Sequence, residues 1–170
     1  PALAGTSSVL NYLLGRDHTR TPGFAPIGEN MHATISKVRA AMQELLDKGG
    51  QAFDEPSGAL AYLKGLIRAQ VRHGAAYIDV NVDEFGKDDL ELRKKMMRDY
   101  VRLVKRTAGG TPVCVDSGSV DVLEAGLEAW YEGGASAAIS SPLPMINSVK
   151  LHTMDRLLPL VHNYPFKFVA

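Results

Sequence analysis

Carboxylate, amide and hydroxyl side chains recur at the ends of four short apolar segments of the chain. These residues are Glu29 and Asn30 at the first segment, Asp79, Asn81 and Asp83 at the second, Asp116 and Ser117 at the third, and Asn147 and Ser148 at the fourth. A carboxylate accepts two hydrogen bonds side by side, and an amide both donates and accepts. If the segments are parallel strands, their carboxyl ends lie together, and we expect these side chains to form one binding site.

Several of these residues also have a purely structural interpretation. Asp116 could cap the helix that starts near Ser119, and Asn147 could form a turn with its own backbone. Glu29 and Asn30 could cap the first loop instead of reaching a ligand. The sequence leaves these alternatives open, although the repetition of the pattern at four successive segments favours a shared site.

Asp79 and Asn81 are two positions apart, so in a strand both side chains point to the same face of the sheet. The face away from the helices is the better prediction, because a carboxylate beneath a helix layer needs a partner that the sequence does not supply. On that face the two residues either contact a ligand or orient Asp116, and the sequence does not decide between these roles.

The elements that position these residues alternate along the chain. Short runs of β-forming residues predict strands at 25–28, 76–82, 112–116, 145–148 and 166–169, the fourth within a longer segment at 137–149. Apolar periodicity and glycine stops predict helices at 34–48, 56–74, 88–106, 119–131 and 151–162. Strands alternating with helices form right-handed βαβ units around a parallel sheet, so the fold class is α/β. Periodicity alone does not distinguish an open sheet from a barrel.

At these polar positions the sequence resembles pterin-binding methyltransferases that use folate and a corrinoid. Residues 27–32 (IGENMH) resemble the G-E-R-x-N opening of this family. Residues 77–84 (YIDVNVDE) are similar to the I-D-[IVL]-N-[MV] strand of the folate domain of cobalamin-dependent methionine synthase and of methyltetrahydrofolate–corrinoid protein methyltransferase. Residues 113–117 (VCVDS) resemble the family's [IL]-x-[IL]-D-S strand, and residues 145–149 (MINSV) its [IM]-[VI]-N-S strand.

The resemblance implies a TIM (β/α)8-type barrel of the pterin-binding class, of which only about the first five strands are present. Residues 1–170 are then expected to be the N-terminal part of a single pterin-binding barrel domain, because a complete barrel takes about 250 residues. The chain departs from the family pattern at two positions of the first motif, where Asn30 replaces an arginine and His32 an asparagine. Residues 135–144 look like a small insertion before the fourth strand.

The function implied by the resemblance is transfer of a methyl group between methyltetrahydrofolate or tetrahydrofolate and a corrinoid (cobalamin) protein. Asp116 would accept hydrogen bonds from the adjacent N–H donors of the pterin ring, and Asn147 would bond its mixed edge. The expected pterin-binding residues are Asp116, Asn147, Asp79, Asn81, Glu29, Asn30, Ser117 and Ser148. No catalytic residue is assigned, because the later strands that supply the asparagine near the reacting nitrogen in the family are missing here.

Two other functions stay possible. A non-catalytic pterin-binding fragment or subunit would have the same ring-anchoring residues. A dihydropteroate synthase-like enzyme is less favoured, because residues 81–84 (NVDE) lack the glycine- and Ser-Thr-Arg-rich loop of those enzymes. The Asp-x-His-x-x-Gly motif of corrinoid-binding modules is absent from the sequence, so cobalamin is expected on a partner protein.

Composition argues against several further classes. The 19 Lys and Arg residues balance 19 Asp and Glu residues, which argues against a nucleic-acid partner. No apolar run approaches the length of a membrane span, and the first residues do not follow a signal-peptide pattern. None of the 5 histidines has a partner at zinc-ligand spacing, so no metal site is expected.

The single cysteine, Cys114, excludes an internal disulfide and fits a cytoplasmic protein. It lies in a predicted strand, where we expect a core role and no reactive chemistry. A partial barrel exposes the edges of its sheet, which predicts a homo-oligomer.

Overall fold

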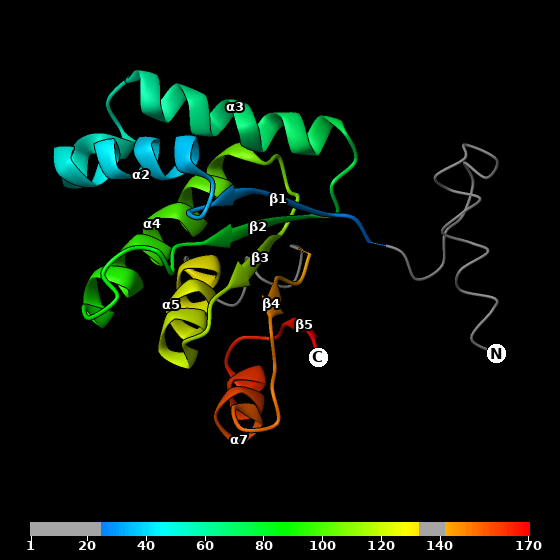
Figure 1. Cartoon of the computed structure of the whole chain (residues 1–170). Helices are drawn as coiled ribbons and strands as arrows, with labels where there is room; N and C mark the ends of the chain where they lie inside the picture. The colour runs from blue at the N-terminus through cyan, green and yellow to red at the C-terminus, as the bar shows by residue number, and fades with distance from the viewer. Residues whose placement is uncertain (1–24, 133–141) are drawn as a thin grey trace.

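The strands form one five-stranded parallel sheet with the long helices packed on one of its sides (Figure 1). The computed structural model describes residues 25–132 and 142–170. The strands lie side by side in chain order, as β1 (Ile27–His32), β2 (Tyr77–Asn81), β3 (Val113–Asp116), β4 (Met145–Asn147) and β5 (Lys167–Val169). A doubly wound open sheet reverses its strand order, whereas this order runs in one direction. The α/β class is therefore confirmed, and the sheet is consistent with part of a TIM-type barrel, with β1 and β5 as the edges of the described strands.

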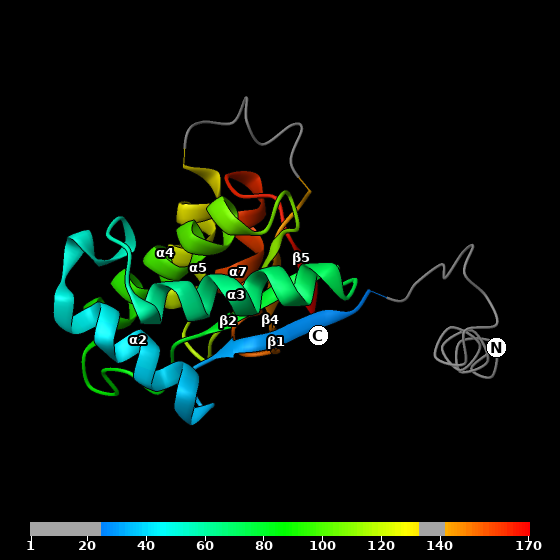
Figure 2. The same ribbon diagram turned by 90° about the horizontal axis from the view of Figure 1, so that it is seen from above.

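The helices follow one another along the sheet. They are α2 (Ser36–Lys48), α3 (Gly58–Arg72), α4 (Leu90–Thr107), α5 (Val120–Tyr131) and the short α7 (Met154–Leu157), with 3-10 turns η1 (Gly50–Phe53) and η2 (Leu158–His162). Helices α2 and α3 lie side by side and pack on β1, whereas α4 packs on β2 and β3, and α5 packs on β3 (Figures 1 and 2). Right-handed connections between strands in consecutive order place all such helices on one face and leave the other face for a site.

Local signals in the sequence explain where the long helices begin and end. Ser57 caps α3 by accepting a hydrogen bond from the Leu60 amide at 3.1 Å, and Asp89 caps α4 in the same way. Gly49 follows α2 with a φ of 80°, which is a conformation that glycine adopts without strain. The predicted apolar stripes are buried between helices and sheet, for example at Met42 and Met97.

Helix α5 lies very close to β3, and Gly126 makes this approach possible. A Cβ atom at Gly126 would lie 2.5 Å from Cγ1 of Val115 and 3.1 Å from Cγ of Met97. The side chain of Val115 therefore points toward the helices, and its neighbours Cys114 and Asp116 point to the opposite face of the sheet.

Replacing Gly126 with alanine should destabilise the protein by about 1 to 3 kcal/mol, because the added methyl group overpacks the interface between α5 and β3. Chemical denaturation would measure this change in the free energy of unfolding. The matched control is Gly65→Ala in α3, where an added Cβ meets nothing within 4 Å. Alanine should stabilise that position by about 0.5 to 1 kcal/mol through helix propensity. A stabilising effect at both positions would contradict the close packing described for Gly126.

Two predicted elements differ from the structure by several residues. The first strand runs from Ile27 to His32, so Glu29 and Asn30 lie within the strand and not after it. The last helix, predicted at 151–162, is reduced to the single α-helical turn of α7 and the 3-10 turn η2. Pro159 explains the change, because proline lacks the amide hydrogen that a continuing α-helix needs.

The predicted fourth strand begins its paired part at Met145, as expected, and ends one residue early at Asn147. Residues 137–141 of its longer segment, and most of the suggested insertion at 135–144, lie outside the described residues. Within residues 25–132 and 142–170, no helix has both the length and the apolar character needed to cross a membrane.

Candidate functional site

Four polar residues occupy aligned positions at the carboxyl ends of the first four strands. His32 pairs in register with Asn81, Asn81 with Asp116, and Asp116 with Asn147. Aligned residues of neighbouring strands point to the same face of a sheet, and for these residues it is the face opposite Val115 and the helices. We call this set the rim row. The structure thus brings His32 together with three of the expected pterin-binding residues.

The Asp116 carboxylate lies in the middle of the rim row. Its Oδ2 atom accepts a hydrogen bond from Nδ2 of Asn81 at 2.9 Å. Nε2 of His32 lies 3.6 Å from the same oxygen. Burial raises the pKa of the Asp116 carboxyl above its usual range, and the Asn81 hydrogen bond and His32 oppose that change. Among the described residues, no hydrogen bond reaches the other carboxylate oxygen, so it can accept one from a ligand.

The loops after β2 and β3 are joined by Asp83, which was expected at the site but not among the pterin-binding residues. Oδ1 of Asp83 accepts a hydrogen bond from the Ser117 hydroxyl at 2.6 Å, and Oδ2 accepts one from the Gly118 amide at 2.8 Å. The Asp83 amide donates to Oδ1 of Asn81 at 3.0 Å. These bonds fix the orientation of Asn81, and Asn81 in turn orients Asp116.

Ser117 and Ser119 have roles within this loop. Ser117 is buried, its hydroxyl donates to Asp83, and its oxygen accepts from the Ser119 amide at 3.1 Å. Ser119 occupies the N-cap position of α5, and its side chain forms no capping hydrogen bond. The predicted pterin contact of Ser117 therefore has to compete with two bonds inside the protein.

Asp79 lies one step deeper on the same face of the sheet. It pairs in register with Cys114, and only 2% of the residue is exposed. Within the described residues its Oδ1 atom is buried without a hydrogen-bond partner. Burial, helped by the negative charges of Asp116 and Glu29, raises the pKa of Asp79 to about 7. Asp79 therefore exchanges a proton near neutral pH.

The structure separates the two roles left open for Asp79 and Asn81. Asn81 bonds directly to Asp116, whereas Asp79 lies beside Cys114 on the neighbouring strand. Burial also raises the pKa of the Cys114 thiol, which disfavours the reactive thiolate. The core role predicted for Cys114 is confirmed.

Glu29 and Asn30 form a bulge in β1. Gly28 pairs with Ile78 and Met31 with Val80, so both residues of the bulge lie opposite the single residue between Ile78 and Val80. Both side chains are exposed, and the Asn30 amide donates to Oε1 of a glutamine in α3 at 2.9 Å. The alternative that they cap a loop is wrong, because both lie inside the strand.

Asn147 and Ser148 lie at the carboxyl end of β4. Asn147 is half-buried, and its carbonyl oxygen accepts a hydrogen bond from the Ser117 amide at 3.2 Å. This bond joins the end of β4 to the end of β3, beside Asp116. Ser148 follows directly and is also half-buried.

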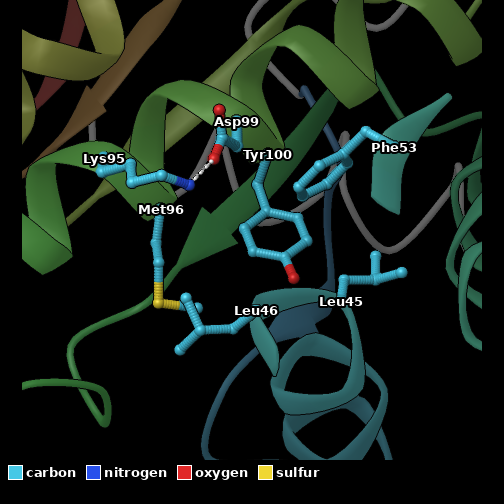
Figure 3. A pocket seen from close by; sticks show the side chains of 7 residues that line it. All are labelled: Leu45, Leu46, Phe53, Lys95, Met96, Asp99 and Tyr100. Carbon is cyan, nitrogen blue, oxygen red and sulfur yellow. Dashed lines mark hydrogen bonds and ion pairs between the residues drawn. The ribbon is translucent and has the colours of Figure 1, made fainter. Parts of the chain in front are cut away.

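A small pocket lies elsewhere, between α2, η1 and α4 (Figure 3). Its lining residues are Leu45, Leu46, Phe53, Lys95, Met96, Asp99 and Tyr100. Its volume is about 10 Å³, which is room for roughly one water molecule. It cannot accommodate an organic ligand. In the described part of the chain, no group of three His, Cys, Asp or Glu residues could hold a metal ion.

The fold and the rim row define a parallel α/β domain with a polar site at the carboxyl ends of its strands. The sequence model of the family described as "Pterin binding enzyme" matches residues 48–170. The chain therefore belongs to the pterin-binding enzyme family. The match includes the strands that hold Asn81, Asp116 and Asn147. It does not include β1, the strand that ends at His32. Among curated proteins, none matches this sequence.

Proposed function

We propose that this protein binds methyltetrahydrofolate or tetrahydrofolate in the rim row and transfers a methyl group to or from a corrinoid (cobalamin) protein. The observation behind this proposal is the alignment of Asn81, Asp116 and Asn147 on one face of the sheet. Membership of the pterin-binding enzyme family supports a pterin as the ligand. That family also contains dihydropteroate synthase-like enzymes, and the four sequence motifs favour methyl transfer over that activity.

The chemistry of the rim row suits the pyrimidine edge of a pterin. This edge presents a ring N–H and an amino group side by side, and a carboxylate can accept both hydrogen bonds. Asp116 is the carboxylate of the rim row, and the bond from Asn81 fixes its orientation. A fixed acceptor loses little side-chain entropy when the ligand binds, which increases affinity.

Methyl transfer from methyltetrahydrofolate makes a ring nitrogen the leaving group. Such a nitrogen leaves more easily when a proton or a hydrogen bond reaches it as charge develops. The corrinoid of the partner protein would accept or supply the methyl group. In this chain, Asp116 and Asn147 would bind and orient the ring, while Asp79, with a pKa of about 7, can hold a proton on the same face.

A methyl-transfer assay tests the proposal. Intact protein mixed with methyltetrahydrofolate and reduced cobalamin should change the cobalamin absorbance at a rate proportional to protein concentration. Omitting either the protein or the folate should abolish the change. Saturable pterin binding without methyl transfer would favour a non-catalytic pterin-binding subunit. Absence of pterin binding would reject the proposal. The corrinoid partner, the homo-oligomer and the cytoplasmic location stay predictions.

A further inference from the structure

His32 is the member of the rim row that lies outside the region matched by the pterin-binding family. Its side chain is 24% exposed, and its Nε2 atom lies 3.6 Å from Oδ2 of Asp116. This distance is longer than a normal hydrogen bond. The imidazole therefore stands beside the carboxylate, and its Nε2 atom can still bond a ligand that contacts both groups.

Thr34 determines which nitrogen of His32 has the proton. The Thr34 amide donates to Nδ1 of His32 at 3.3 Å, and the Thr34 hydroxyl lies 2.7 Å from the same atom. A backbone N–H can only donate, so Nδ1 must be the acceptor in this pair. Neutral His32 then has its proton on Nε2. The rim row thus presents an N–H donor from His32 next to the carboxylate acceptor of Asp116.

We propose that His32 is a specificity-determining residue that donates a hydrogen bond from Nε2 to the 4-oxo group of the bound pterin. The inference rests on the proposed pterin site. In a 2-amino-4-oxopyrimidine, the oxo acceptor is adjacent to the ring N–H that pairs with a carboxylate. A donor beside Asp116 therefore matches an acceptor beside the paired N–H. A ligand with an amino group at position 4 would instead bring two donors together at His32.

The geometry of β1 supports this role. The bulge at Glu29 and Asn30 adds one residue, and this addition brings His32 into register with Asn81. Met31 is then fully buried and pairs with Val80, on the face of the sheet that the helices cover. The bulge therefore aims His32 toward Asp116.

The test compares the binding of 2-amino-4-oxopteridine and 2,4-diaminopteridine by calorimetry. His32→Asn should weaken binding of the 4-oxo compound about three- to tenfold, because the shorter amide does not reach the position of Nε2. Binding of the 4-amino compound should not weaken. His32→Gln places a nitrogen near the position of Nε2 and should restore most of the preference. His73→Asn is the matched control, because this histidine follows α3 and bonds its Nδ1 to the Ala69 carbonyl oxygen at 2.7 Å.

Equal effects of His32→Asn on both compounds, or no effect on either, would overturn the role of His32 and leave the pterin site intact. Failure of the unmodified protein to bind the 4-oxo compound would instead reject the proposed function together with this inference. Thermal unfolding of each variant shows whether it is folded. If His32→Asn does not fold, the His32→Gln variant decides. Loss of the preference for the 4-oxo compound in that variant would also overturn the inference.

Discussion

Replacing Asp116 with asparagine should weaken tetrahydrofolate binding by a factor of about ten or more. A hydrogen bond to a charged group contributes about 1.5 to 3 kcal/mol, and asparagine removes both the charge and one of the two acceptor oxygens. The affinity of the intact protein for tetrahydrofolate, measured by calorimetry, checks this expectation. The asparagine amide oxygen can still accept the bond that Asn81 donates to Asp116 at 2.9 Å, so the fold should persist.

The matched control for this prediction is Asp121→Asn. Asp121 lies in the first turn of α5, is partly exposed, and accepts a hydrogen bond from Arg156 at 3.0 Å. It has the same chemistry as Asp116 but lies outside the rim row. Equal affinity in the Asp116 variant and the unmodified protein would show that Asp116 does not anchor the pterin. Equal losses in both variants would point to a general effect of charge or folding.

The strands and the polar residues at their ends could be predicted because both depend on local sequence. Short β-forming runs between amphipathic helices specify parallel βαβ units, and the carboxyl ends of parallel strands meet at one edge. Asp116 and Asn147 follow from this rule, and the structure places them in register. Pro159 also indicated that the last helix would not be continuous, because proline disrupts the interior of an α-helix.

The position of His32 could not be predicted, because it depends on a one-residue bulge. Without the bulge, the register from Gly28 and Ile78 would align Met31 with Asn81. A shift by one residue moves every following side chain to the other face of a strand. Burial of Met31 against the helices favours the bulged register, but strand length and pairing depend on tertiary contacts that local sequence does not reveal.

The hydrogen bonds within the site could not be predicted from the sequence either. Asn81 and Asp116 are 35 positions apart, and Asp83 and Ser117 are 34 apart. Their bonds require the register of β2 and β3 to be known. The sequence did offer one signal for Asp83, because it comes two residues after Asn81 at a strand end. An acidic residue at that position can bond the next loop as well as a ligand.

Asp79 should make the protein less stable as pH rises from about 5 to about 8, and Asp79→Asn should remove that loss. Burial raises the pKa of Asp79 from 3.8 to about 7, so the folded state prefers the protonated carboxyl. The stability gained from this preference is complete below pH 3.8 and is lost as pH rises through 7. Across the interval from pH 5 to pH 8, the loss should be about 2 to 3 kcal/mol.

Denaturant unfolding of both proteins at several pH values measures this effect. The free energy of unfolding of Asp79→Asn, relative to the unmodified protein, should increase steadily with pH, because asparagine does not ionise. Ile78→Val is the matched control, since it alters the neighbouring buried residue of β2 without an ionisable group. It should lower stability by about 0.5 to 1.5 kcal/mol at every pH. A constant difference between Asp79→Asn and the unmodified protein would mean that Asp79 ionises alike in the folded and unfolded chain. Such a result would also remove Asp79 as a proton-holding group beside the proposed pterin site.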